Sequence, residues 1–139
     1  MGSGAVHLKL QWLGLISCTA ASTWLLGRII LELTQPGAVW LITASAICAF
    51  YCSDLLSGIV HWAFDRYGTE NIPVLGPNII KSFRDHHKNP QGICGHNFLE
   101  TNGDNCIVCL PLLVVGLILD PTDQLFWVSL FFCTSIGGI

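Results

Sequence analysis

Charged residues are scarce in this sequence. Lys, Arg, Asp and Glu make up 11% of its 139 residues, whereas they make up about 25% of a typical soluble domain. Hydrophobic residues reach 52%. A chain with so little charge and so much apolar surface is typical of a membrane protein.

Basic residues are especially few, and they form no tract. The chain has six Lys and Arg residues and a formal net charge of -3. Proteins that bind nucleic acid carry clustered Lys and Arg on one face. We therefore expect no nucleic-acid partner.

Lipidation and cleavage signals are also missing from the N-terminus. A myristoylation signal has Ser or Thr at position 6, where this chain has Val6. The apolar stretch that follows continues to Leu33, longer than the core of about 7 to 15 residues in a cleaved signal peptide. We expect this stretch to remain as a membrane anchor.

Cysteine, in contrast, is frequent, with seven residues. Four of them lie in apolar runs, where cysteine acts as a small hydrophobic residue. Cys106 and Cys109 form one CxxC pair, but no second pair follows at the spacing of a zinc finger. We expect reduced cysteines that serve packing.

Apolar runs long enough for membrane spans dominate the rest of the chain, because a helix needs about 20 apolar residues to cross a bilayer. Arg28 and Glu32 lie one turn apart near the end of the first, where they can pair and snorkel. The last two are short, so they form either a tight helical hairpin or two spans of which the second is cut off. The fold class is all-α: one multi-span transmembrane domain, residues 1–139, with about four spans. They cover residues 11–33, 38–64, 106–119 and 125–139.

The histidine-rich segment, residues 61–105, is the one long polar part. Its many Gly and Pro residues exclude a single continuous helix. By the positive-inside rule, its basic residues place it in the cytoplasm, together with the N-terminus. These are four of the six basic residues: Arg66, Lys81, Arg84 and Lys88.

Four of the five histidines lie in this segment: His61, His86, His87 and His96. Imidazole is the commonest neutral metal ligand, so the cluster predicts a metal site. His7 stands apart with no acidic neighbour in the sequence, and we expect it to be an interfacial residue only.

His61 lies on a helical stripe with two carboxylates. Asp54, Gly58, His61 and Asp65 follow at offsets of 0, 4, 7 and 11, which places them on one face of a helix. A charge inside the bilayer costs about 2.5 to 3.5 kcal/mol and usually faces a partner. The pattern favours a metal site or residues that support one. The alternative is a solvated Asp54 at the interface and a His61 that only caps the helix.

The adjacent His86 and His87 belong to the sequence FRDHHKNP. Neighbouring side chains on a helix point about 100° apart, so the two rings can address two metal ions, or one ion and a carboxylate. The alternative is a solvated pair beside Arg84, Asp85 and Lys88.

His96 and Glu100 in GHNFLETNGDN have the i, i+4 spacing of one helical face, and Asp104 follows one turn later. His96 is a candidate metal ligand, and both acidic residues are candidates to bind or orient the ligands. Asn102-Gly103 favours a turn as the alternative. Several imidazoles with carboxylates and no thiolate set suit iron or zinc, and iron is favoured for oxygen chemistry.

The motifs HWxxDxxG, FRxHH and GHxFxETNGDN, in this order over about residues 50–110, resemble those of the Kua-type plasmanylethanolamine desaturases. The resemblance implies a multi-span enzyme of the endoplasmic reticulum or a bacterial membrane, with a di-iron centre. Such enzymes use molecular oxygen, with electrons from a donor such as cytochrome b5 and its reductase. Their substrate is a membrane lipid, an ether phospholipid that is desaturated beside its ether oxygen.

The resemblance also implies residue roles and an incomplete ligand set. His61, His86, His87 and His96 match the family's histidines, and Asp65 matches its acidic partner. Further histidine boxes would begin where this chain ends, so we expect it to be incomplete at the C-terminus and inactive alone. The alternatives are another metal-dependent membrane oxygenase or hydrolase, and a non-catalytic membrane protein.

Overall fold

The chain is mainly helical in the part that the computed structural model describes, residues 2–73, 76–95 and 97–139. No strand occurs in these ranges, which confirms the predicted all-α class. Five α-helices are joined by short segments of 3-10 or π geometry. The helices are α1 (Gly2–Leu31), α2 (Ala38–Tyr67), α3 (Lys81–Lys88), α4 (Phe98–Ile118) and α5 (Pro121–Gly137); the short segments are η1 (Glu32–Thr34), η2 (Gly76–Ile80) and η3 (Gly92–Gly95).

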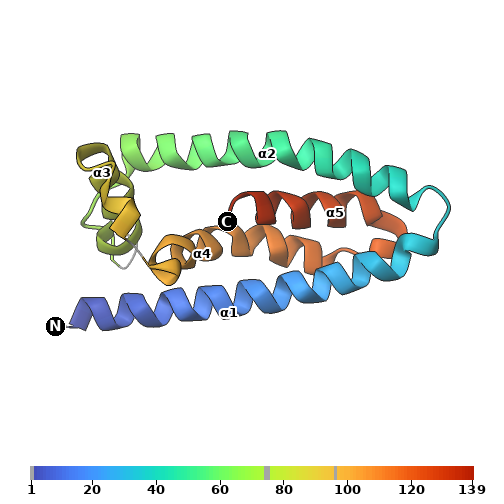
Figure 1. Ribbon diagram of the computed structural model, residues 1–139, viewed down its shortest axis with the longest axis horizontal. Helices are drawn as coiled ribbons and strands as arrows, with labels where there is room; N and C mark the ends of the chain where they lie inside the picture. Colours follow the sequence, from blue (N-terminus) through green and yellow to red (C-terminus); the bar gives the residue numbers. More distant parts are fainter. Residues whose placement is uncertain (1, 74–75, 96) are drawn as a thin grey trace.

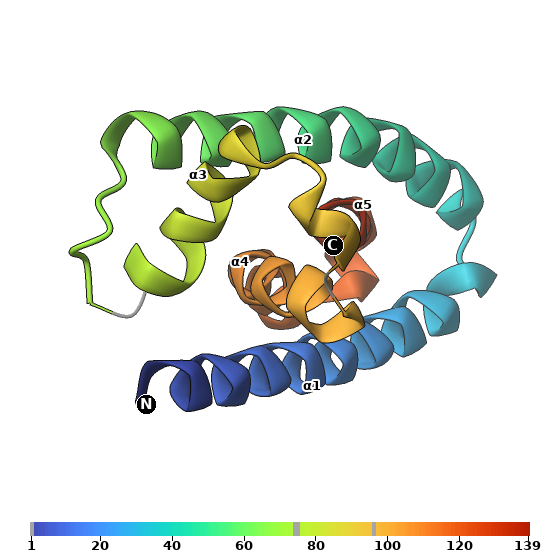
Figure 2. The ribbon, with the colours of Figure 1, turned by 60° about the vertical axis from the view of Figure 1, so that its left-hand side comes forward.

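Two long helices and a helical hairpin make up the bundle. α1 and α2 run antiparallel along the whole molecule, and the hairpin of α4 and α5 lies between them (Figure 1). Within this arrangement α4 packs mainly on α1, and α5 packs mainly on α2. α3 lies at the end of the bundle where α1 begins and α2 ends (Figure 2). The histidine-rich segment is therefore gathered at one end.

Three of the helices are long and apolar enough to cross a membrane: Ala5–Thr34, Ala38–Tyr67 and Phe98–Ile118. α5 has 17 residues and is shorter. The sequence left open whether the last two apolar stretches form a hairpin, and α4 and α5 do so. Many large apolar side chains on the outside are exposed, as in Trp40 at 78% and Phe50 at 72%, which suits lipid as the surrounding solvent.

The start of α4 corrects the predicted boundary. α4 begins at Phe98, eight residues before the predicted start at residue 106. Polar residues were excluded from the apolar span, yet they form the first two turns. Asn97 and Glu100 make a capping box at this start, and such a box stabilises a helix N-terminus whatever the polarity of the next turn. Asn102-Gly103 lies inside α4, so the turn alternative is wrong.

The core consists of small and medium-sized side chains between α1, α4 and α5. Leu25, Leu113 and Val128 are fully buried. Cys18 and Cys106 are buried beside them, and the cysteines of the described part whose side chains are placed form no disulfide. The predicted packing role of the cysteines fits this core.

Arg28 fixes the end of the bundle that is remote from α3. Its Nη1 donates to the carbonyl oxygens of Leu117 at 3.4 Å and Leu119 at 3.1 Å, and its Nη2 lies 3.7 Å from Asp120 Oδ1. Glu32 instead accepts a hydrogen bond from the Gln35 side chain. The predicted Arg28–Glu32 pair is therefore wrong, because the exposed carbonyls at the end of α4 engage the guanidinium.

Candidate metal centre

Arg84 attaches α3 to the end of α2. Its Nη2 donates to the carbonyl oxygen of Gly68 at 2.7 Å and to that of Asp65 at 3.3 Å. The last carbonyls of a helix have no partner within the helix, and a cation there also interacts favourably with the helix dipole. With one side chain, Arg84 thus pairs free carbonyl groups at the end of α2 and orients α3.

Gly68 allows the two elements to come close. A Cβ atom at this position would lie 2.4 Å from the carbonyl oxygen of Phe64 and 2.8 Å from Cγ2 of Ile80. Ile80 ends the π-helical η2 and is buried, as is Ile79. The glycine and these two isoleucines hold the lead-in to α3 against the end of α2.

Three side chains converge where α3 meets α2. His61 and Asp65 lie one turn apart on α2, and His87 reaches them from α3. His87 Nε2 is 3.0 Å from Asp65 Oδ2 and 3.0 Å from His61 Nε2. His61 Nε2 is 3.3 Å from the same Asp65 oxygen. The group is half-exposed, with 34% of each of the His61 and Asp65 side chains and 53% of the His87 side chain accessible.

These distances fit three ligands of one metal ion. Ligand atoms bound about 2.0 to 2.2 Å from a common ion lie roughly 3 Å apart when they occupy neighbouring positions. Two imidazoles and one carboxylate on the same side of an ion form the ligand set of non-haem iron oxygenases, which leaves other positions open. Among the described residues, His61, Asp65 and His87 are the group that could hold a metal ion.

The remaining two predicted ligands lie outside what the structure describes. His86 belongs to α3 by its backbone, but its side chain is not among the described parts, and His96 lies outside the described residues. Their roles as ligands stay predictions.

The other predicted acidic residues do not join the group of three. Asp54 is exposed on α2, seven residues before His61 and therefore about 10 Å away along the helix axis. The Glu100 carboxylate accepts the Asn97 backbone N–H at 2.9 Å in the capping box of α4. Any role for these carboxylates in supporting a metal stays a prediction.

Asp104 pairs with His7, a contact that sequence reasoning missed. Its Oδ1 lies 2.9 Å from His7 Nε2 and accepts a hydrogen bond from Gln11 Nε2 at 3.4 Å. Gly103 lets α1 approach, since a Cβ there would lie 2.6 Å from Cβ of Gln11. The pair is 97 residues apart in sequence, so no local pattern could reveal it, and His7 does have an acidic neighbour in space.

Arg84 is the second residue whose role was missed. The sequence indicates only a topology role for it, as one of the basic residues of the histidine-rich segment. The available signal was its position three residues before His87, one turn away on the same side of α3. The structure uses it as a positioning residue for that histidine.

The same region carries the similarity to known proteins. Residues 50–138 match the lipid desaturase domain. The chain is 38% identical over 105 residues to plasmanylethanolamine desaturase of Myxococcus xanthus, covering 76% of this chain and 36% of that protein. It is 34% identical over 135 residues to plasmanylethanolamine desaturase 1 of Mus musculus, covering 92% of this chain and 49% of that protein.

A plant protein shows a shorter match. Chloroplastic fatty acid desaturase 4 of Arabidopsis thaliana is 45% identical over 49 residues, 35% of this chain and 15% of that protein. No solved structure matches the chain significantly. This chain spans between about a third and a half of the two plasmanylethanolamine desaturases that it matches. From the matched domain and these identities, the chain belongs to the lipid desaturase domain family.

Proposed function

We propose that this protein acts as a membrane-bound, iron-dependent lipid desaturase that introduces the vinyl-ether double bond of plasmalogens into plasmanyl ether phospholipids. The observation that carries this proposal is the convergence of His61, Asp65 and His87 at the end of an apolar helix long enough to cross a membrane. Membership of the lipid desaturase domain family and the names of the two matched plasmanylethanolamine desaturases support it.

The depth of the three ligands suits this reaction. α2 has 30 residues and so is about 45 Å long, whereas about 20 residues cross the hydrocarbon core. His61 and Asp65 lie within its last seven residues, which supports a position near the membrane surface. A bond beside the ether oxygen also lies near that surface, because the oxygen joins the chain to the glycerol that carries the headgroup.

Each residue of the site has a task in this proposal. Bound iron supplies the oxidising chemistry, with molecular oxygen, that removes hydrogen from an unactivated carbon. His61, Asp65 and His87 hold and orient the ion, and Arg84 keeps His87 in place. The apolar walls of α2 and α4 keep water from the reacting chain.

Further features of the proposed enzyme rest on the sequence. His86 and His96 supply ligands to a second iron ion, and Asp54, Glu100 and Asp104 orient ligands. Electrons come from cytochrome b5 and its reductase or an equivalent donor. The protein resides in the endoplasmic reticulum membrane in a eukaryote, with the histidine-rich segment in the cytoplasm.

The test is the production of vinyl-ether phospholipid in cells. Cells that make plasmanyl lipids but lack plasmalogens are given the gene that encodes this sequence, and vinyl-ether lipid is measured by mass spectrometry. We expect product when the further histidine boxes that the resemblance implies are supplied together with this sequence, and none when that protein carries His61→Ala or Asp65→Asn. Asp85→Asn, an exposed change on α3, is the matched control and should retain product.

The metal content of the purified protein separates the proposal from its rivals. Iron and oxygen consumption together with vinyl-ether product support the desaturase. Iron and oxygen consumption without that product indicate another oxygenase, and zinc without oxygen use indicates a hydrolase. A protein with neither metal nor product is a non-catalytic membrane protein. Undiminished vinyl-ether lipid in the His61 and Asp65 variants contradicts the proposed site.

A further inference from the structure

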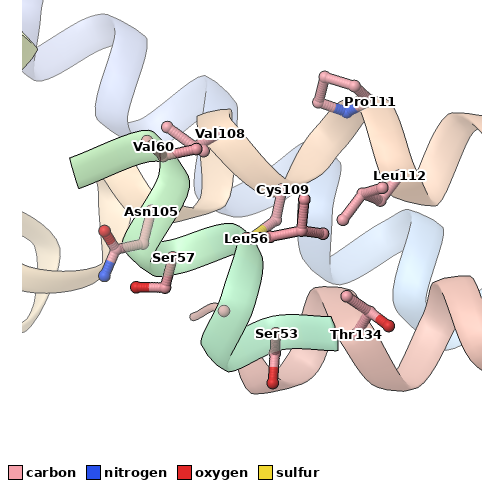
Figure 3. A pocket seen from close by; sticks show the side chains of 11 residues that line it. Ser53, Leu56, Ser57, Val60, Asn105, Val108, Cys109, Pro111, Leu112 and Thr134 are labelled. Atoms are coloured by element: carbon pink, nitrogen blue, oxygen red, sulfur yellow. The ribbon is translucent and has the colours of Figure 1, made fainter. Parts of the chain in front are cut away.

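An apolar groove lies between α2 and α4. Its volume is about 260 Å³, and the last turn of α5 contributes to its lining. In Figure 3, Leu56 and Val60 of α2 face Val108 and Leu112 of α4. These residues form a continuous hydrocarbon lining within helices that can cross a membrane.

The groove and the metal ligands share one side of α2. Ser53, Ser57 and His61 follow at intervals of four residues, which is one stripe of a helix. Ser53 and Ser57 line the groove, and Val60, also in its lining, directly precedes His61. From Ser53 to His61 the stripe covers about 12 Å of helix axis, so the groove lies along the part of α2 that directly precedes His61.

Two of the polar side chains that line the groove are hydrogen-bonded within the protein. Ser53 Oγ donates to the carbonyl oxygen of Phe50 at 3.0 Å, and Asn105 Nδ2 donates to the carbonyl oxygen of Ile139 at 3.3 Å. A polar ligand would leave its own groups unpaired in such a slot, which is costly. The lining therefore favours a hydrocarbon occupant.

The size of the groove restricts that occupant further. Pockets that enclose whole small ligands measure about 300 to 1,000 Å³, and this one lies just below that range. Leu56 is 38% exposed, so the groove is open at its side. A single chain can enter from the surrounding bilayer, whereas a headgroup with two chains is too large.

We propose that this groove holds the alkyl chain of the membrane phospholipid substrate, with the headgroup-proximal carbons beside His61 and Asp65 and the more distal carbons between Leu56 and Leu112. The substrate's identity rests on the proposed function; the binding itself does not require turnover. The chain enters with its polar end toward the membrane surface, because the ligands lie at the surface end of α2. The geometry thus directs the reaction to the first carbons of the chain rather than to its middle.

A photoreactive lipid tests the groove directly. The probe is a 1-O-alkyl-2-acyl phosphatidylethanolamine that carries a diazirine a few carbons along its alkyl chain, diluted into phosphatidylcholine nanodiscs that contain the protein. After irradiation, the labelled residues are mapped by mass spectrometry. We expect labelling of the lining on both helices, in the regions of Leu56–Val60 and Val108–Leu112.

Two variants and one control sharpen the map. Leu56→Trp fills the groove from α2 and should reduce labelling of the α4 wall by about tenfold, because the chain loses its apolar contacts. Leu112→Trp does the same from α4. Leu55→Trp adds the same ring at an exposed neighbouring position, 63% accessible, and should leave labelling unchanged.

The outcomes separate this inference from the proposed function. Labelling only at outward positions such as Ile59, in the natural sequence, overturns the groove, and so does full labelling of the opposite wall in both filled variants. Groove labelling without any vinyl-ether product contradicts the proposed reaction alone. Product without groove labelling contradicts the groove alone.

Discussion

The two ends of the bundle are closed by the same interaction, yet they differ in what surrounds it. Arg84 at one end donates to the carbonyls of Asp65 and Gly68, at the end of α2. Arg28 at the other donates to the carbonyls of Leu117 and Leu119, at the end of α4. In both cases an arginine from another helix satisfies carbonyls that the helix itself leaves unpaired.

The carboxylates near the two arginines have different partners. Arg28 lies near Asp120, so a carboxylate in the turn before α5 balances its charge. At the other end, the carboxylate of Asp65 is turned away from Arg84 toward His61 and His87. An acidic residue that faces two imidazoles rather than a nearby cation suits a metal site better than an ion pair.

Removal of a ligand should give the largest difference between the two ends. We expect His87→Ala to lower the affinity for ferrous ion by more than about 100-fold, since losses outside the ligand set already cost about 10 to 100-fold. The measurement is metal content after dialysis against a graded chelator. Asp85→Asn, two residues away on α3, is the control. Equal iron content in the His87 variant and the control would remove His87 from the site.

Removal of each arginine should give the next largest difference in metal affinity between the two ends. Arg84→Ala should lower metal affinity by about 10 to 100-fold because it releases α3, although Arg84 is not itself placed as a ligand. Arg28→Ala should leave metal affinity unchanged. The same chelator titration applies to both. If both variants bind metal equally well, α3 is held by other contacts.

A methyl group at Gly68 should crowd the junction of α2 with the segment that leads into α3, and so disturb the end of the bundle that holds the candidate metal centre. Gly68→Ala places a Cβ against Phe64 and Ile80, and overpacking of this kind costs about 1 to 3 kcal/mol. The free energy of unfolding in detergent and the metal affinity should both fall. Gly58→Ala is the matched control on the same helix, since its Cβ would meet nothing within 4 Å. A similar loss in both variants would exclude crowding as the cause.

The His7–Asp104 contact should matter for stability by a smaller amount. It joins α1 to α4 at 2.9 Å, and a hydrogen bond of this kind contributes about 1 kcal/mol. A double-mutant cycle with His7→Ala and Asp104→Ala measures their coupling in the free energy of unfolding. Additive losses would show that the contact does not contribute.

The smallest expected effect is a loss of thermal stability at acidic pH, which arises from Asp120 beside Arg28. The hydrogen bonds from the backbone N–H and side chain of Thr122 hold the pKa of Asp120 below its usual value of 3.8, and Arg28 adds to this. A lowered pKa stabilises the fold above about pH 4, and this contribution is lost as pH falls through the folded-state pKa. The Tm difference between the natural protein and Asp120→Asn should therefore shrink from pH 6 to pH 3. A constant difference would contradict this linkage.

How much the sequence could predict depended on the range of each interaction. The spans follow from the length of the apolar runs, and the His61–Asp65 pair follows from helical periodicity; both can be taken directly from the sequence. The approach of His87 to Asp65 depends on Arg84 and Gly68, and the approach of His7 to Asp104 depends on Gly103. These contacts join residues far apart in sequence, so only the folded structure reveals them. The early start of α4 was missed because a span was judged by apolar character, whereas its first turns are set by a capping box.

The ligands also differ in how firmly the chain holds them. His61 and Asp65 belong to a 30-residue helix, whereas His87 belongs to an eight-residue helix tied to α2 mainly by one side chain. A shared ion would add a cross-link between the two. Loading with metal should then slow amide hydrogen exchange across α3 far more than in the middle of α2, so that folding of this short helix itself reports occupancy.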